Sequence, residues 1–188
     1  SVRLEPKSVI KRMSSLLSIG YAVPGLILAV GMVQLLIYLD SFTTKIDIVL
    51  TGSLVGLVTA YVIKTYALAN SSIESGYERI SFSIDDSSKL LGSNGWSMLS
   101  RIHAPLLKTS ILTSVLLVMS DVVKELPATL ILRPFNFETL AVSTYIYASE
   151  ERMLQAAAPA IAIVLVGLIP IILLSKMIRS SRMVQKNV

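Results

Sequence analysis

Residues 86–105 read DSSKLLGSNGWSMLSRIHAP and lie between two long apolar segments of the chain. The stretch is too polar to cross a lipid bilayer, and it contains two glycines and a proline. Glycine and proline mark turns and helix boundaries, so their positions predict a folded insert rather than a featureless linker. The composition of the whole chain indicates the surroundings in which such an insert would lie.

The composition indicates an integral membrane protein. The chain has 188 residues, of which 53% are hydrophobic and 15% are charged, and its mean hydropathy is +0.71. Soluble domains contain about 25% charged residues. The absence of cysteine excludes disulfides and thiolate chemistry, and the single histidine, His103, excludes a cage of several histidines within this chain. The net charge of +5 fits basic residues that orient membrane helices better than it fits nucleic-acid binding.

Four segments are long enough and apolar enough to cross a membrane, which takes about 20 residues of helix. The alternative, four buried helices of a soluble protein, leaves too little polar surface to cover them. We therefore predict an all-α polytopic transmembrane bundle that forms a single domain over residues 1–188. The predicted spans are residues 16–39, 46–69, 110–132 and 156–177, with a loop at 70–109.

The positions of lysine and arginine predict the orientation. Taken in order from the N-terminal segment through the three connections to the tail, the segments contain 4, 1, 4, 2 and 4 of these residues. Cytoplasmic segments are the ones that carry the excess of lysine and arginine. Both ends of the chain and the loop at 70–109 are therefore expected in the cytoplasm, with the connection at 133–155 outside.

Charged residues within the predicted spans need partners or water. Asp121, Lys124 and Glu125 lie in the third span, and Lys64 lies in the second. Asp121 and Lys124 are three residues apart and can pair on one helix face, whereas Glu125 points elsewhere and could pair with Lys64. These four residues form either structural ion pairs or the lining of a translocation path. Pro127 is expected to bend the helix just beyond them.

The outward connection is expected to contain a short helix at 140–147, followed by a helix that Ser149 caps. Glu150 and Glu151 would then lie in the first turn of the last helix, where acids are favourable. The other interpretation of these two acids is an outer contact for a cationic substrate.

The insert itself predicts two short helices. Ser83 and Asp86 resemble a capping box, with a helix from 84 to about 91. Gly92 is suited to the left-handed end of that helix. A second helix is expected to begin near Asn94, and Pro105 suits the first turn of the next one.

The second short helix is expected to carry an apolar face formed by Trp96, Leu99 and Ile102. Two short helices cannot bury such a face alone. The unit must therefore pack on the membrane domain, lie on the lipid surface or dock into a partner.

The spacing within this insert resembles the cytoplasmic motif of permease subunits of bacterial ABC importers. That motif consists of a glutamate, two alanines, three residues, a glycine, nine residues, and then isoleucine, any residue, leucine and proline. Here the motif positions are filled by Asp86, Ser87, Ser88, Gly92, Ile102, His103, Ala104 and Pro105. Every spacing is kept, while four residue types differ: Asp86 for glutamate, the two serines for alanines, and Ala104 for leucine.

A second set of residues is similar to the C-terminal half of ferric-iron uptake permeases. Lys124 to Pro127 form a lysine–glutamate–leucine–proline run, and Arg133 to Phe135 form an arginine–proline–phenylalanine run. The stretch GYAVPGLILAVG at 20–31 fits the same group, whose close relatives include thiamine permeases. These permeases usually contain two similar halves in one chain, so this chain resembles the second half.

The resemblance implies a helical permease of the MetI-like type that performs no chemistry itself and needs no cofactor. A dimer of separate cytoplasmic ATPase subunits would bind ATP and magnesium, and a soluble binding protein would deliver the substrate. A second permease half and membrane lipid would be further partners, and the bacterial inner membrane would be the location. The motif residues would dock on the ATPase, whose movement would drive alternating access.

Two other classes of function are also open. In an ion-coupled secondary transporter, Lys64, Asp121, Lys124 and Glu125 would relay protons. In a membrane scaffold, the loop at 70–109 would be an amphipathic anchor on the lipid surface. The chain contains no glycine-rich nucleotide-binding loop of the G-x-x-x-x-G-K-[ST] type, so ATP hydrolysis is not expected in this chain.

Overall fold

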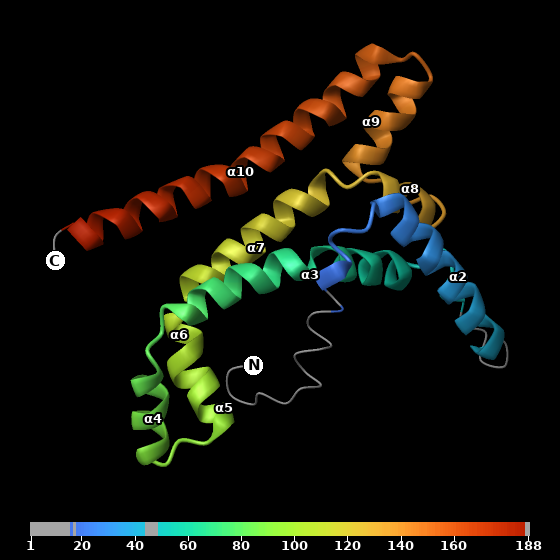
Figure 1. Ribbon diagram of the computed structural model, residues 1–188. Helices are drawn as coiled ribbons and strands as arrows, with labels where there is room; N and C mark the ends of the chain where they lie inside the picture. Colours follow the sequence, from blue (N-terminus) through green and yellow to red (C-terminus); the bar gives the residue numbers. More distant parts are fainter. Residues whose placement is uncertain (1–15, 17, 44–48, 187–188) are drawn as a thin grey trace.

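The described part of the chain is mostly helical and contains no strand. A computed structural model describes residues 16, 18–43 and 49–186, and Figure 1 shows their arrangement. The predicted all-α fold is confirmed. The helices are α2 (Gly25–Thr43), α3 (Leu54–Glu78), α4 (Phe82–Leu90), α5 (Gly95–Met98), the π-helical turn η1 (Leu99–His103), α6 (Ala104–Leu106), α7 (Lys108–Val123), α8 (Pro127–Leu132), α9 (Leu140–Ser149) and α10 (Met153–Lys186).

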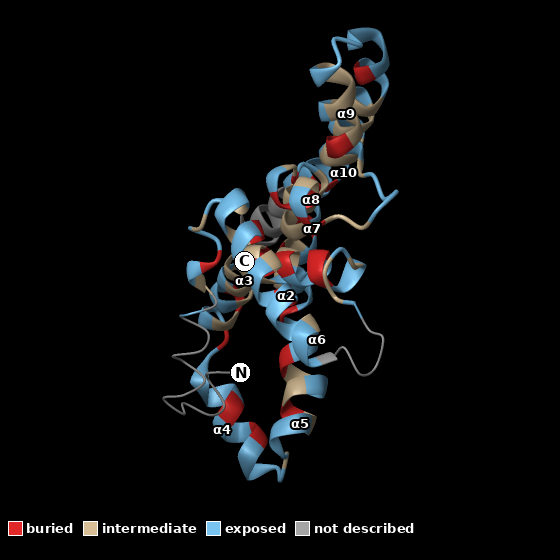
Figure 2. Ribbon diagram, turned by 90° about the vertical axis from the view of Figure 1, so that its right-hand side faces the viewer, coloured by how far each residue is buried: buried red, intermediate tan, exposed pale blue. Residues whose placement is uncertain are grey.

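The helices pack in a staggered row. α7 lies along α3, and α10 packs on α7 and α9 (Figure 1). On the other side, α2 packs on α8 and on α3. The segment from α4 to α6 forms a hairpin, residues 81–107, that projects from the end of the α3–α7 pair, and Figure 2 shows its two arms. We call α4 the first arm and α5, η1 and α6 the second arm.

The buried core is small and lies at one end of this row. It consists of side chains from α2, α3 and α8, among them Met32, Leu57 and Leu132. Most large apolar side chains on α2 and α10 are exposed instead, such as Ile37 at 56% and Leu165 at 60%. Such helices are stable when lipid tails or further helices cover them, because exposing so much apolar surface to water is unfavourable.

The boundaries of the first two predicted segments need correction. Residues 16, 18 and 19 are helical, but the chain turns at residues 20–23 and α2 begins at Gly25, since Pro24 disfavours helical geometry in the residue before it. α3 begins at Leu54, because Gly52 adopts a left-handed φ of +70° and Ser53 caps the helix. α3 then continues to Glu78, so it includes the first residues of the predicted loop. Residues 1–15 and 44–48 lie outside the described residues, and so do the basic residues in them that were used to predict the orientation.

The third predicted segment is two helices rather than one. α7 ends at Val123 and α8 begins at Pro127, because proline removes a backbone donor and cannot continue the helix. The predicted bend just beyond the charged residues is thus a complete break, which begins at Lys124 and ends at Pro127. The fourth segment is the 34-residue helix α10, which continues through Pro159 and Pro170.

Two described helices are long and apolar enough to cross a bilayer. They are residues 25–42 of α2 and residues 153–176 of α10. The second arm and α7 would form a third crossing if they are taken as one span with a bend of 73°. The count of four crossings, and the domain limits derived from it, stay predictions.

Candidate functional site

The first helix of the hairpin begins two residues earlier than its sequence suggests. Ser81, not Ser83, is the N-cap of α4, and its hydroxyl accepts a hydrogen bond from the Ser83 backbone N–H at 3.2 Å. Ser81 has extended backbone angles, whereas Ser83 is already helical. The prediction that Ser83 caps this helix is wrong, because a suitable serine two residues earlier takes that place.

The turn at Gly92 confirms the predicted end of α4. Gly92 has a φ of +78°, which side-chain-bearing residues rarely adopt. The Ser93 N–H bonds to the Ser88 carbonyl at 3.1 Å, and the Gly92 N–H bonds to the Lys89 carbonyl at 3.0 Å. These two bonds together are a Schellman motif, which ends the helix and fixes the direction of the following chain.

The second arm also begins and ends at predicted residues. The Asn94 side chain caps α5 by accepting a hydrogen bond from the Ser97 N–H at 2.8 Å. Pro105 lies in the first turn of α6, where its missing N–H is not needed. The expected apolar face is present only in part, however. Trp96 is 76% exposed, and Met98 and His103 are the residues buried in this arm.

The far end of the hairpin is an apolar tip, which we define as Leu90, Leu91 and Trp96. Their exposed fractions are 89%, 86% and 76%. Phe82, at the start of α4, is 71% exposed as well. Large apolar side chains grouped at an exposed tip indicate a surface that a partner or lipid covers.

The motif residues are divided between the two faces of the hairpin. Asp86 and Ser87 are exposed, and Asp86 pairs with Lys89 of the same helix at 3.7 Å. Ser88 is buried, and Ile102 is half-buried. A partner could therefore reach Asp86 and Ser87 directly. The docking role of the motif residues stays a prediction.

Sequence reasoning missed a buried pair inside the hairpin. His103 of η1 and Asp85 of α4 lie 2.8 Å apart between Nε2 and Oδ1, and His103 is fully buried. Their separation of 18 residues gives no helical or strand periodicity that could have revealed them. A lone histidine close to a proline, and an aspartate beside the motif position Asp86, were the available signals.

The Glu125 carboxylate is buried where α2, α3 and α8 meet. It forms an ion pair with Lys64 of α3, as the sequence predicted, and its Oε1 accepts a bond from the Ala128 N–H at 3.3 Å. A Cβ atom at Gly25, the first residue of α2, would lie 2.7 Å from that oxygen. Glycine at this position therefore lets α2 approach the ion pair closely.

Asp121 and Lys124 form a separate pair. Their side chains lie 3.3 Å apart, and Lys124 remains 68% exposed. The structure thus arranges the four charged residues predicted for the spans as two pairs, Lys64 with Glu125 and Asp121 with Lys124. Glu125 and Lys124 point differently although they are adjacent, as expected for neighbours at a helix end.

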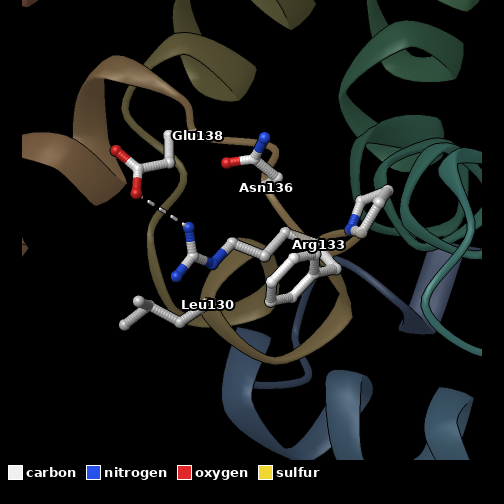
Figure 3. A pocket seen from close by; sticks show the side chains of 6 residues that line it. Leu130, Arg133, Asn136 and Glu138 are labelled. Carbon is white, nitrogen blue, oxygen red and sulfur yellow. Dashed lines mark hydrogen bonds and ion pairs between the residues drawn. The ribbon is translucent and has the colours of Figure 1, made fainter.

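A shallow hollow lies in the loop after α8, away from the hairpin. Its volume is about 440 Å³, and Figure 3 shows Arg133 extending across it to Glu138, with 3.4 Å between Nη1 and Oε1. Asn136 adopts a φ of +61°, and Phe135 is fully exposed beside it. The short helix predicted at 140–147 is present as α9. The prediction that Ser149 caps the last helix is wrong, because Ser149 is the last residue of α9. The chain then turns at Glu150 and Glu151, so these two acids precede α10 instead of lying in its first turn.

The fold and the hairpin together define a class of protein: an all-α protein with helices apolar enough to cross a membrane and a projecting helical hairpin between two long helices. The comparison with known families agrees. Residues 4–182 match the family described as the inner membrane component of binding-protein-dependent transport systems, and the chain belongs to this family. It is thus a component of a transporter of the ABC importer type and an inner membrane protein.

Two relatives show how far the similarity extends. The chain is 27% identical over 158 residues to the Fe(3+)-transport system permease protein FbpB 2 of Haemophilus influenzae, covering 83% of this chain and 29% of that protein. It is 28% identical over 120 residues to PhnV of Salmonella typhimurium, which carries the name of a 2-aminoethylphosphonate transport system permease protein. That match covers 64% of this chain and 45% of PhnV. The chain therefore spans less than half the length of these relatives, and no solved structure matches it significantly.

Proposed function

We propose that this chain is the part of an ABC importer permease that receives movement from an ATPase and opens a path for substrate across the inner membrane. The observation that carries the proposal is the hairpin. Its motif spacing is folded into two capped helices around a left-handed Gly92, and its apolar tip is exposed. A dimer of cytoplasmic ATPase subunits, which would bind ATP and magnesium, is the proposed partner of that tip.

The geometry suits mechanical coupling. The Schellman motif at Gly92 and the Asn94 cap fix the angle between the arms without help from a partner. The second arm continues through α6 into α7, which lies along α3. A push on the tip would therefore reach the long helices, where it could switch the path between inward-open and outward-open states.

The proposed orientation follows from the charges. The hairpin and both ends of the chain would lie in the cytoplasm, and the loop with Arg133 and Glu138 would lie outside. α3 leads into the hairpin and α7 leads away from it, so the two helices run in opposite directions on one side of the molecule (Figure 1). A soluble binding protein would dock on the outer side, and a second permease half would complete the path.

The buried ion pair is proposed to fasten the junction of α2, α3 and α8 rather than to relay protons. Glu125 is 7% exposed, and the close approach of Gly25 leaves little room beside its carboxylate. The Tyr61 and Thr129 hydroxyls form a second bond between α3 and α8 in the same place. A relay through all four charged residues would need a continuous chain of contacts, whereas the structure arranges them as two pairs.

Ferric iron is the proposed substrate. The sequence similarity to a permease named for Fe(3+) transport, together with the lysine–glutamate–leucine–proline run from Lys124 to Pro127, supports it. The similarity to PhnV makes 2-aminoethylphosphonate a second candidate. Thiamine is a third candidate, which rests only on the resemblance of the sequence to ferric-iron permeases and their relatives. Uptake assays with each labelled compound would choose among the three.

The test of this function is uptake into vesicles that contain the whole permease, its ATPase and its binding protein. We expect accumulation of labelled ferric iron that requires ATP inside the compartment facing the hairpin, and that stops when the ATPase is omitted. Accumulation that follows a proton gradient without any ATPase would instead support an ion-coupled transporter.

Gly92 offers a sharp test of the docking hairpin. No atom lies within 4 Å of a Cβ placed at Gly92 or at Gly95, but only Gly92 has a positive φ. The Gly92→Ala change therefore adds backbone strain of about 1 kcal/mol without a steric clash, and Gly92→Val adds more. We expect ATPase copurification to fall for both Gly92 variants and to stay normal for Gly95→Ala, with membrane levels unchanged in all three. Normal copurification of Gly92→Val would contradict the proposed role of the turn.

A further inference from the structure

A buried acid–base pair joins the two arms of the hairpin. The Nε2 atom of His103 and the Oδ1 atom of Asp85 lie 2.8 Å apart, and the exposed fractions of the two residues are 0% and 5%. A carboxylate can only accept, so His103 donates its Nε2–H to Asp85. This bond connects the first arm to the second between two buried side chains, where a hydrogen bond is little exposed to competition from water.

An irregular turn of the backbone directs His103 into this position. Met98 and His103 are both buried although they are five residues apart. Of the four residues between them, Ser100 and Arg101 are exposed, and the other two are half-buried. In a regular α-helix, residues four apart share a face, so Ile102 would follow Met98. The π-helical turn from Leu99 to His103 contains one residue more, and it replaces Ile102 by His103 on the inner face.

His103 lies where three segments meet. Its ring contacts the ring of Tyr77, in the last turn of α3, edge to face with 5.3 Å between the centroids. Its carbonyl accepts the Leu107 N–H at 2.8 Å, directly before α7 begins. The residue that holds Asp85 is therefore also in contact with α3 and bonded to the base of α7.

The first arm presents little other buried surface to the rest of the molecule. Of the nine residues of α4, only Asp85 and Ser88 are buried, and the opposite side of the helix is exposed. A partner that binds the exposed side would press on α4, and Asp85 lies on the side that faces the second arm. A hydrogen bond at this place would make α4 and the second arm move as one body.

We propose that Asp85 and His103 are positioning residues whose buried bond transmits a displacement of α4 to the second arm and so to α7. This inference rests on the proposed function, since it needs an ATPase that displaces α4. Neither residue would touch the ATPase or the substrate. They would act only by keeping the two arms rigid relative to each other.

The first test measures that rigidity directly. The chain contains no cysteine, so spin labels at Ser83→Cys on α4 and Ser100→Cys on the second arm report one distance only. In the assembled transporter we expect the same distance with and without ATP. In a chain that also carries His103→Leu, ATP should shift or broaden the distance distribution. A distance that changes with ATP in the chain with His103 intact would overturn the proposal, as would an unchanged distribution in the His103→Leu chain.

The second test separates coupling from folding. His103→Gln keeps a donor near the position of Nε2, whereas His103→Leu removes it. We expect His103→Leu to retain its ATPase and to hydrolyse ATP, but to transport about tenfold less substrate per ATP hydrolysed, the scale expected for a lost buried bond. His103→Gln should stay within about twofold of the unchanged chain. Ser100→Leu, a similar change on the exposed side of the same turn, is the matched control and should behave as His103→Gln does.

The outcomes distinguish this inference from the function on which it rests. If the unchanged chain binds no ATPase and shows no ATP-driven uptake, both fail. If the unchanged chain transports and His103→Leu transports equally well per ATP hydrolysed, only the transmitting role fails. If the His103→Leu chain fails to accumulate in the membrane, the spin-label distance in the chain with His103 intact still tests the proposal, because that measurement needs no substitution of Asp85 or His103.

Discussion

Two residue pairs of similar composition occupy different environments in this chain. Lys64 and Glu125 are mostly buried and come from different helices, whereas Lys124 is exposed and pairs with Asp121 one turn away. A buried carboxylate that loses its cation keeps the full cost of desolvation. An exposed pair is screened by water and contributes little. The two pairs should therefore differ sharply when a lysine is removed.

This difference is measurable as stability in detergent. We expect Lys64→Met to lower the free energy of unfolding by about 3–5 kcal/mol, because Glu125 is left buried without its partner. Lys124→Met should cost at most about 1 kcal/mol. The double change Lys64→Met with Glu125→Gln should recover part of the loss, since the amide oxygen can still accept the Ala128 N–H. Thermal unfolding of the three variants would measure this, and equal losses for the two lysines would contradict the assignment.

The packing of long helices is decided at the contact between α3 and α7. A Cβ atom at Gly76 would collide with the Ser110 side chain and would lie 2.9 Å from Cδ2 of Leu107. The missing side chain of Gly76 therefore lets the base of α7 lie against the end of α3, next to the hairpin.

A valine at this position should push the two helices apart. We expect Gly76→Val to lower the free energy of unfolding by about 1–3 kcal/mol, as overpacking does elsewhere. Gly167→Val, within α10, is the matched control, because no atom lies within 4 Å of its added Cβ. The control should change stability by less than about 1 kcal/mol. Equal unfolding temperatures for the two variants would show that the α3–α7 contact is looser than the structure indicates.

The sequence predicted those features of the elements that depend on local chemistry. The helix end at Gly92, the cap at Asn94, the start at Pro105 and the break at Pro127 each follow from one residue's backbone or hydrogen-bonding preference. The features it missed depend on competition or on distant contacts. Ser81 displaced Ser83 as a cap because two serines could serve, and the π-helical turn at 99–103 has no sequence signature of its own.

In the candidate site, too, the sequence predicted the features that depend on local chemistry and missed those that depend on distant contacts. Its spacing from Asp86 to Pro105 could be read from the sequence, and the pairing of Lys64 with Glu125 was among the arrangements considered. The Asp85–His103 bond could not be read, since it joins residues 18 apart whose faces are set by the irregular turn. Burial of His103 is a result of tertiary packing, which periodicity alone does not report.

As a whole, the molecule has little core of its own and much exposed apolar surface. The buried cluster is formed by α2, α3 and α8, while α10 exposes large apolar side chains between Met153 and Leu173. The chain also spans less than half of the relatives that it matches. Both observations agree with a chain that works within a larger membrane assembly, as its family does.

The central claim is that the hairpin tip binds an ATPase, and cross-linking in the assembled transporter tests it most directly. Because the chain has no cysteine, Leu91→Cys and Phe135→Cys each introduce a single thiol, the first at the exposed hairpin tip and the second in the exposed loop after α8. With a short thiol-directed photo-cross-linker, we predict a product containing the ATPase subunit from Leu91→Cys and none from Phe135→Cys. A product from Phe135→Cys alone, or equal products from both, would contradict the account.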